Sequence, residues 1–393
     1  MIFTLEALEA QKGDCLVLSW GKTGGKIRHI VIDAGPKGVW ASSLSKRLLE
    51  LRKGQKTPSD EALPIEMVMI SHIDDDHING ILDFFSVLEK NKLAMPYRVK
   101  TMWFNSFDEI LNNGPDELKS RLASFGGDVA AGKVASNLFG LGEGARHSEA
   151  VIASVAQGRQ LRSRALGLGI LMNAGFKGLV MSQDKRVTFS LADGLKFHIV
   201  APSLKRLKAL HDDWEKNVEK NPTDAKVAAF TDRSVANLSS IVIVAELEGK
   251  TMLLTGDARG DDILAGLAGA GFIDSAKKGK VHFDVIKMPH HGSSRNMTLD
   301  FLKRITADHY VISANGEHDN PDVETVDWIG QARGGESFRL HLTNEKMVEP
   351  KTQTDVGAAV KAALAKHKIL DQTAFRPAAG LGVRVELFDQ LAF

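Results

Sequence analysis

Apolar residues in the first third of the chain come in short runs, each closed by glycine or charged residues. Runs of this length, rich in Ile, Val and Leu, are typical of β-strands. Residues 40–53 differ, because their apolar positions recur at helical spacing. The strands predicted here are 2–9, 15–20, 28–33 and 66–71. The pattern therefore indicates hairpins followed by a strand–helix–strand rhythm.

The middle of the chain changes character before the rhythm returns. Residues 105–190 are rich in Ala, Gly and Leu, and we predict a helical insertion there that caps the core. Residues 331–393 mix strand-like and helical segments, and we expect a C-terminal extension that completes the second half. Further strands are predicted at 187–191, 196–200, 239–246, 251–254, 283–288 and 310–313. This alternation predicts an α/β fold, with residues 1–393 as one domain.

Composition and charge exclude several classes of protein. Fifty Lys and Arg against 49 Asp and Glu leave a net charge of +1, so no global basic field indicates a nucleic-acid partner. The single cysteine, Cys15, excludes an internal disulfide framework and a multi-cysteine zinc module. The start of the chain has no signal-peptide pattern, and no run of about 18 apolar residues occurs. We therefore expect a cytoplasmic protein with no membrane span.

The stretch most informative about chemistry is the predicted strand-to-helix loop that starts at Ser71. It holds two imidazoles and three carboxylates, those of His72, Asp74, Asp75, Asp76 and His77. Such groups are costly to keep together unless a cation gathers them. The alternative for Asp76 is a helix N-cap, which would account for that residue alone.

Other predicted strands also end in groups that can bind a metal. Asp257 follows an apolar strand and a glycine, and His290 and His291 follow another strand. Successive strand side chains face opposite ways, so adjacent histidines are seldom both core residues. Residues 28–33 end in the same manner, on Asp33. A strand–Gly–Asp turn alone is common loop chemistry, but the segments together predict a metal centre.

Together these residues resemble the metallo-β-lactamase-fold hydrolases. That family has His-x-His-x-Asp-His after a strand, a later Asp that bridges two metals, and a His at the end of a further strand. Here Asp74 replaces the second His. With the sequence Pro-His-His-Gly-Ser at 289–293, the chain is similar to the branch containing the metallo-hydrolase domain of bacterial DNA-uptake (competence) channel proteins. The resemblance spans Asp33 to His318 and implies an αβ/βα sandwich.

The resemblance also implies two divalent metal ions. His72 and Asp74 would hold one ion, Asp76 and His77 the other, and Asp257 would bridge them. One of His290 and His291 would complete the second site, and we favour His291 because Gly292 follows it. Asp74 adds a hard oxygen donor, so zinc and manganese both remain candidates.

Two further roles stay open at this point. The third histidine of the first site is not evident, since His147 lies in the insertion and His198 fits an ordinary strand histidine. The catalytic candidates are Asp76 and His318. His318 would donate a proton to the leaving oxygen or complete a metal site, and a surface turn is the alternative.

The surroundings of the predicted centre suggest its substrate. Hydroxyl, amide and guanidinium groups can bind phosphate oxygens, and we predict this role for Ser293, Ser294, Arg295 and Asn315. The alternative is an ordinary Ser/Asn loop. We therefore expect a phosphodiesterase or nuclease that uses a metal-bound hydroxide, and the nucleic-acid or nucleotide partner is implied mainly by the resemblance. The alternatives are a lactone or thioester hydrolase, and a non-catalytic binding or regulatory module whose helical insertion contacts a protein partner.

Overall fold

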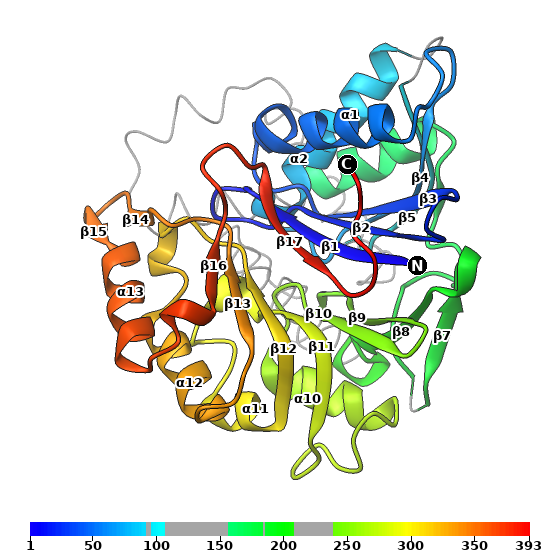
Figure 1. Cartoon of the computed structure of the whole chain (residues 1–393). Coiled ribbons are helices and arrows are strands. Elements are labelled where there is room, and N and C mark those ends of the chain that lie inside the picture. Colours follow the sequence, from blue (N-terminus) through cyan, green and yellow to red (C-terminus); the bar gives the residue numbers. More distant parts are fainter. Residues whose placement is uncertain (92–95, 107–155, 184, 208–238) are drawn as a thin grey trace, which may run out of the picture.

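The computed structural model describes residues 1–91, 96–106, 156–183, 185–207 and 239–393. Two large sheets form the centre of the molecule (Figure 1). A small two-stranded ribbon lies beside them, made of β14 (Val348–Glu349) and β15 (Thr354–Asp355). Within the described part of the chain, no helix has both the length and the apolar character that crossing a membrane requires.

The first sheet has the strand order β17-β1-β2-β3-β4-β5-β6. Its members are β1 (Ile2–Leu8), β2 (Leu16–Gly21), β3 (Ile27–Ile32), β4 (Leu63–Met69), β5 (Tyr97–Trp103), β6 (Leu171–Met172) and β17 (Gly382–Glu386). The strands β1, β2 and β3 are joined as antiparallel hairpins, and β3, β4 and β5 run parallel. Every residue of β1 and β2 is buried, as expected for strands covered on both faces.

The second sheet has the strand order β16-β13-β12-β11-β10-β9-β8-β7. Its members are β7 (Val187–Ser190), β8 (Lys196–Ala201), β9 (Val242–Leu247), β10 (Lys250–Leu254), β11 (Val281–Lys287), β12 (Ile305–Ile312), β13 (Arg339–Leu342) and β16 (Thr373–Phe375). In this sheet β10, β11, β12, β13 and β16 run parallel to one another. The strands β7, β8, β9 and β10 pair antiparallel.

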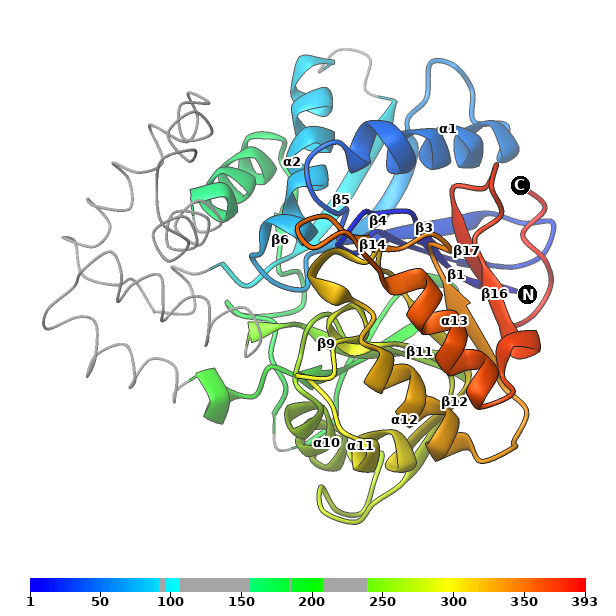
Figure 2. The same cartoon turned by 90° about the vertical axis from the view of Figure 1, so that its left-hand side faces the viewer.

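Helices cover the outer faces of the sheets. The helices are α1 (Ser45–Gly54), α2 (Asp75–Lys90), the segment 156–167, α10 (Gly260–Gly269), α11 (Leu299–Arg304), α12 (Val323–Arg333) and α13 (Val356–Lys366). Figure 2 shows α1 and α2 on one side of the sheets and α10, α11 and α12 on the opposite side. The arrangement has four layers: helices, sheet, sheet, helices.

Three hydrophobic clusters hold these layers together. One packs α1 and α2 on the first sheet, through residues such as Leu48 and Phe84. A second packs the C-terminal helices on the second sheet, through residues such as Val326. The third lies between the sheets, where Met69 and Val285 belong to the same cluster. The α/β class and the αβ/βα sandwich predicted from the sequence are confirmed.

The predicted helical insertion at 105–190 stays a prediction. Residues 107–155, with His147, lie outside the described residues. Within the described part of that range, 156–167 is helical, whereas β6 and β7 are strands of the two sheets. The end of the range therefore belongs to the central sheets.

The segment 331–393 contributes to both halves of the fold. We expected it to complete the second half, and β13 and β16 do extend the second sheet. However, β17 pairs antiparallel with β1 of the first sheet. The guanidinium of Arg384 on β17 donates to the Glu6 carboxylate on β1 at 2.9 Å. The C-terminal strand therefore joins the half of the molecule that begins the chain.

Candidate metal centre

The candidate ligands lie on loops that follow parallel strands in both sheets, or in the first turn of α2. After β4 the chain passes His72 and enters α2, with Asp74 in an extended conformation at the N-cap position. After β10 it reaches Asp257, and after β11 it forms a 3-10 turn at Pro289–Gly292. Loops at the carboxyl ends of neighbouring parallel strands share one edge of a sheet. In this chain those edges bring the predicted ligands of both halves together.

The backbone at the centre takes unusual conformations. His290 and His291 have φ angles of 47° and 55°, in the left-handed region that side chains disfavour. Gly256 has a φ of 49°, and a Cβ there would lie 2.8 Å from the Cβ of Ser71. The loop after β10 therefore touches the loop after β4, and only glycine permits that approach.

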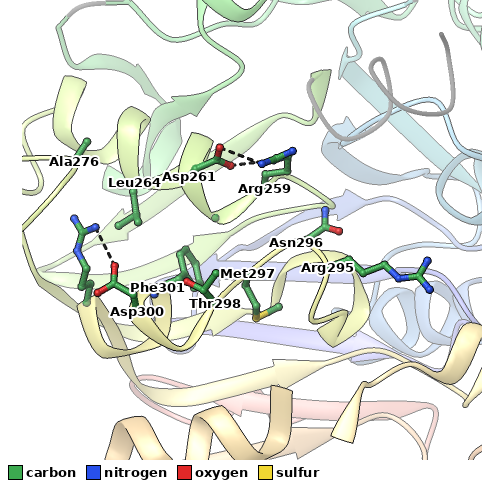
Figure 3. A pocket seen from close by; sticks show the side chains of 12 residues that line it. Arg259, Asp261, Leu264, Ala276, Arg295, Asn296, Met297, Thr298, Asp300 and Phe301 are labelled. Atoms are coloured by element: carbon green, nitrogen blue, oxygen red, sulfur yellow. Dashed lines mark hydrogen bonds and ion pairs between the residues drawn. The ribbon is translucent and has the colours of Figure 1, made fainter. Parts of the chain in front are cut away.

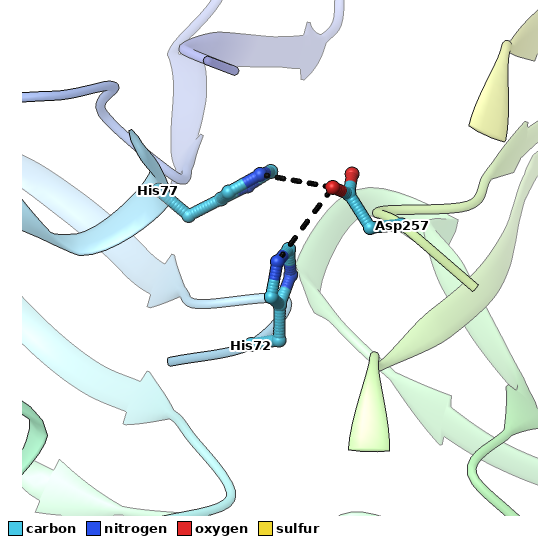
Figure 4. A group of neighbouring side chains, drawn as sticks. All are labelled: His72, His77 and Asp257. Carbon is cyan, nitrogen blue, oxygen red and sulfur yellow. Dashed lines mark ion pairs between the residues drawn. The ribbon is translucent and has the colours of Figure 1, made fainter. Parts of the chain in front are cut away.

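One carboxylate oxygen lies at the middle of four imidazoles. The Oδ2 atom of Asp257 is 3.7 Å from Nε2 of His72 and 3.6 Å from Nε2 of His77, His290 and His291. Figure 4 shows His72 and His77, from the segment after β4, pointing toward Asp257 on a separate loop. Residues from three separate segments of the chain therefore lie close together around this oxygen.

Each imidazole uses its other nitrogen to contact an oxygen atom outside this group. The contacts of Nδ1 are Asp33 Oδ2 for His77 (2.9 Å), Ser71 Oγ for His72 (3.0 Å), Asn296 Oδ1 for His290 (2.8 Å) and the Ser313 carbonyl for His291 (3.1 Å). An acceptor at Nδ1 keeps the proton there and leaves a lone pair on Nε2. Metal-binding histidines are oriented by this kind of contact.

The atoms that face inward lack protein partners. The Nε2 atoms of His72, His77 and His291 and the Oδ1 atom of Asp257 are buried, and they make no hydrogen bond within the described part of the chain. Donor atoms held about 2.1 Å from one tetrahedral cation lie about 3.4 Å apart. The separations of 3.6 and 3.7 Å around Asp257 are close to this value. Nitrogen and carboxylate donors so arranged fit divalent cations.

The carboxylates at the start of α2 lie near different imidazoles of this group. Asp74 Oδ2 is 3.5 Å from Nε2 of His72. The Asp76 carboxylate is 3.9 Å from Nε2 of His77 and 3.7 Å from Nε2 of His291. Asp74, rather than Asp76, occupies the N-cap position, and it makes no side-chain cap hydrogen bond. The alternative role of Asp76 as an N-cap is therefore wrong.

Strong electrostatic coupling links these groups. Burial alone would raise the pKa of Asp257, but His290, His291 and other imidazoles hold it well below its usual range. Burial would likewise lower the pKa of His77, but the negative charges of Asp257 and Asp33 raise that pKa well above its usual range. The carboxylates and imidazoles of the centre therefore favour a bound positive charge. A metal cation can supply that charge, as a proton can.

Three residues predicted to bind substrate make hydrogen bonds that stabilise turns near the centre. The Ser293 hydroxyl and the Ser294 backbone N–H both donate to Asp322 Oδ2, at 3.4 and 2.7 Å. The Asn315 side chain accepts from the backbone N–H of Glu317 at 3.0 Å. These contacts fix turns beside the centre.

The other candidate histidines lie apart from the four imidazoles. The His318 side chain is 59% exposed, and its nearest recorded carboxylate oxygen is that of Glu317 at 3.9 Å. His198 bonds to Thr188 at 2.9 Å and to Glu246 at 2.8 Å on the second sheet. Both ring nitrogens of His198 are thus engaged, which matches the strand-histidine alternative.

A pocket of about 340 Å³ adjoins the centre (Figure 3). It is lined by residues that include Arg259, Arg295, Asn296 and Arg304. Asn296 also donates to the Asp257 carbonyl at 2.9 Å, so one residue belongs to both the pocket and the centre. Arg295, a predicted substrate-binding residue, is exposed and makes no ion pair within the described residues.

Sequence reasoning missed the supporting roles of several residues around the ligands. Asp33 was singled out as a strand-end ligand candidate, but its carboxylate accepts from the Ser71 backbone N–H and hydroxyl, at 2.8 and 2.6 Å, and from His77. Asp14 lies between the predicted strands 2–9 and 15–20, and Lys287 lies within the predicted strand 283–288, so neither position indicated a role at the centre. The structure buries both beside His291. No local pattern in the sequence links positions so far apart.

Comparison with known proteins gives only distant likenesses. The sequence matches no family profile and no curated protein. Among solved structures, Zn²⁺-bound PqqB from Methylobacterium extorquens has a TM-score of 0.35 and 13% identity, over 94% of this chain and 87% of that one. A metallo-β-lactamase from Cronobacter sakazakii has a TM-score of 0.27 and 12% identity, over 91% and 86% of the two chains. A long-form RNase Z from yeast has a TM-score of 0.33 and 10% identity, over 93% of this chain and 44% of that one.

Proposed function

We propose that this protein is a metal-dependent hydrolase with two divalent cations, zinc or manganese. The proposal is carried by the four imidazoles whose Nε2 atoms surround one Asp257 oxygen while their Nδ1 atoms are bonded elsewhere. In this proposal one cation takes His72, Asp74 and His290, and the other takes Asp76, His77 and His291. Asp257 lies between them. His290 would thereby supply the third donor that the sequence left unassigned.

Cations bound here would lower the pKa of a coordinated water, so that it can act as a nucleophile near neutral pH. The chain's own residues prepare the site for this. Asp33, Asn296 and Ser313 fix the imidazole rings, so the donors need no rearrangement when substrate arrives. Asp76 is a proposed ligand whose carboxylate lies 3.7 Å from Nε2 of His291, which fits its proposed catalytic role.

His318 remains the candidate that protonates the leaving group. Lys12 Nζ lies 3.4 Å from Glu317 Oε1, the neighbour of His318. Asp75 and Asp76 also act on Lys12 electrostatically, so this lysine links the His318 turn to the metal loop. An exposed imidazole on a turn that Lys12 connects to the metal loop supports this role.

We further propose that the substrate is a phosphodiester, in nucleic acid or a nucleotide. The support is the arginine-lined pocket that shares Asn296 with the centre. Arg259 and Arg304 have carboxylate neighbours, Asp261 and Asp300, whereas Arg295 is available for an anionic group. Guanidinium groups match phosphate oxygens in geometry and charge.

Metal analysis of the purified protein, followed by cleavage assays, tests both proposals. The substrates are plasmid DNA, single-stranded DNA, RNA, bis-(p-nitrophenyl) phosphate and a lactone. We expect up to two bound metal ions per chain and hydrolysis of a phosphodiester. Lactone turnover without phosphodiester turnover would make the substrate proposal wrong and leave the hydrolase proposal standing. Metal-free protein that gains no activity on adding Zn²⁺ or Mn²⁺ would contradict both.

A further inference from the structure

A buried ion pair lies directly beside His291. Asp14 Oδ2 is 2.6 Å from Lys287 Nζ, and the two side chains are 1% and 0% exposed. Removing two charges from water costs several kcal/mol per ion, on the order of the total stability of many domains. Replacing such a pair with apolar residues is often neutral. A pair enclosed this completely therefore calls for a role besides stability.

The pair contacts the ligand through Asp14. Its Oδ1 atom is 3.4 Å from Nδ1 of His291, the nitrogen that donates to the Ser313 carbonyl at 3.1 Å. The Ser313 hydroxyl in turn donates to the Gly13 carbonyl at 2.7 Å. The loop that carries Asp14 is thus hydrogen-bonded to Ser313, the residue that accepts the hydrogen bond from His291.

Lys287 fixes the other end of the same carboxylate. It is the last residue of β11 and lies four positions before His291. Donor atoms of Asp14, Asp257 and His291 lie within 4.8 Å of one another, so an unrestrained Asp14 would itself be in reach of a cation. The ammonium group of Lys287 holds Asp14 in its supporting position and offsets its charge.

We propose that Asp14 and Lys287 form a positioning pair that holds His291 as a ligand of the second cation. The inference rests on the metal binding proposed above. A carboxylate beside Nδ1–H orients an imidazole and makes Nε2 a stronger donor. His291 needs such support because its backbone is held at a φ of 55°. Neither residue of the pair touches the substrate in this role.

The first test measures metal affinity in the full chain. Zn²⁺ is titrated into metal-free wild type and Asp14→Asn in competition with a chromophoric chelator. We expect the weaker of the two Zn²⁺ affinities to fall about 10–100-fold in Asp14→Asn, the usual effect of losing an outer-shell partner. The spectrum of Co²⁺-substituted protein should change as well, because the ligand field at His291 changes.

A double variant distinguishes a role of the Asp14–Lys287 pair in positioning His291 from a role in stability alone. Asp14→Asn leaves Lys287 buried without its partner, so its Tm should fall. Asp14→Leu with Lys287→Met replaces the pair by apolar residues and should regain most of the Tm. The weakened Zn²⁺ affinity should persist in that double variant, since the carboxylate beside Nδ1 of His291 is absent.

Another buried ion pair provides the matched control. Glu6 Oε2 and Arg47 Nε lie 2.9 Å apart, with side chains 6% and 3% exposed, on β1 and α1. Glu6→Gln should lower the Tm and leave both Zn²⁺ affinities unchanged. A Zn²⁺ affinity in Asp14→Asn equal to that of wild type, or full recovery of both quantities in the double variant, would overturn the positioning role. If wild type itself binds no metal, the proposed function fails instead.

Discussion

At the scale of single residues, the contacts of the two ring nitrogens distinguish a proposed ligand from a structural histidine. His198 has both ring nitrogens bonded, to Thr188 and Glu246. His77 has one nitrogen bonded to Asp33, and its other nitrogen is buried without a hydrogen bond in the described structure. A buried polar atom without a partner costs free energy, and a bound cation would offset that cost at the His77 nitrogen. This difference cannot be read from the sequence, where each is simply a histidine near a strand.

Removing a central ligand should abolish activity while the fold persists. Asp257→Ala and His77→Ala should each lower metal-dependent turnover by more than about 100-fold, because losing only an outer-shell partner costs 10–100-fold. Asp75→Ala should have a milder effect, since Asp75 is exposed at the start of α2. Turnover and circular dichroism are the measurements. His282→Ala is the control, because that histidine is 49% exposed on β11. Undiminished turnover in either ligand variant would contradict the site assignment.

The adjacent residues His290 and His291 should bind different cations. His291 lies 3.7 Å from Asp76, whereas the recorded carboxylate contact of His290 is with Asp257, at 3.6 Å. We expect His290→Ala to lose one of two bound ions and to keep the cation at Asp76 and His77. Metal content per chain, measured by plasma mass spectrometry after dialysis, checks this. Retention of both ions in His290→Ala would remove His290 from the ligand set.

At the scale of elements, close backbone contacts set the distance between the loops of the centre. A Cβ at Gly13 would lie 1.8 Å from the Asp76 carbonyl oxygen, so Gly13→Ala must push the first hairpin away from α2. We expect a loss of about 1–3 kcal/mol in the free energy of unfolding, typical of overpacking, together with weaker metal binding. Denaturant melts and metal titration measure the two effects. Gly167→Ala is the control, because nothing lies within 4 Å of a Cβ there. Equal stability of Gly13→Ala and wild type would show that the hairpin can move freely.

The sequence predicts elements better than it predicts their contacts. Apolar runs located most strands, and the ends of those strands located His72, His77 and Asp257. The sequence could not predict that β17 returns to pair with β1, because that pairing joins opposite ends of the chain. Nor could it predict the roles of Asp14 and Lys287, since a charged residue in a turn or strand usually faces water. Their burial depends on the meeting of two loops in three dimensions.

At the scale of the whole molecule, the centre links the two halves of the fold. His72, Asp76 and His77 follow β4 of the first sheet. Asp257, His290 and His291 follow β10 and β11 of the second sheet. Cations bound between them would therefore join the sheets from one side, while a shared hydrophobic cluster joins them inside. Metal binding and folding should thus be coupled through the entire chain.

Removing the cations with a chelator should consequently lower the stability of both halves of the protein together, with a single unfolding transition. A cation that binds only the folded state adds about 2.7 kcal/mol when its concentration is 100 times its Kd. Adding Zn²⁺ or Mn²⁺ to chelator-treated protein should raise the Tm by several degrees. The same addition to Asp257→Ala should give a much smaller rise, because the oxygen that contacts all four imidazoles is gone. Differential scanning calorimetry with and without metal makes the comparison. A wild-type Tm that neither metal nor chelator changes would mean that the two halves are held together without cations, and the inward-facing nitrogens would then need another explanation.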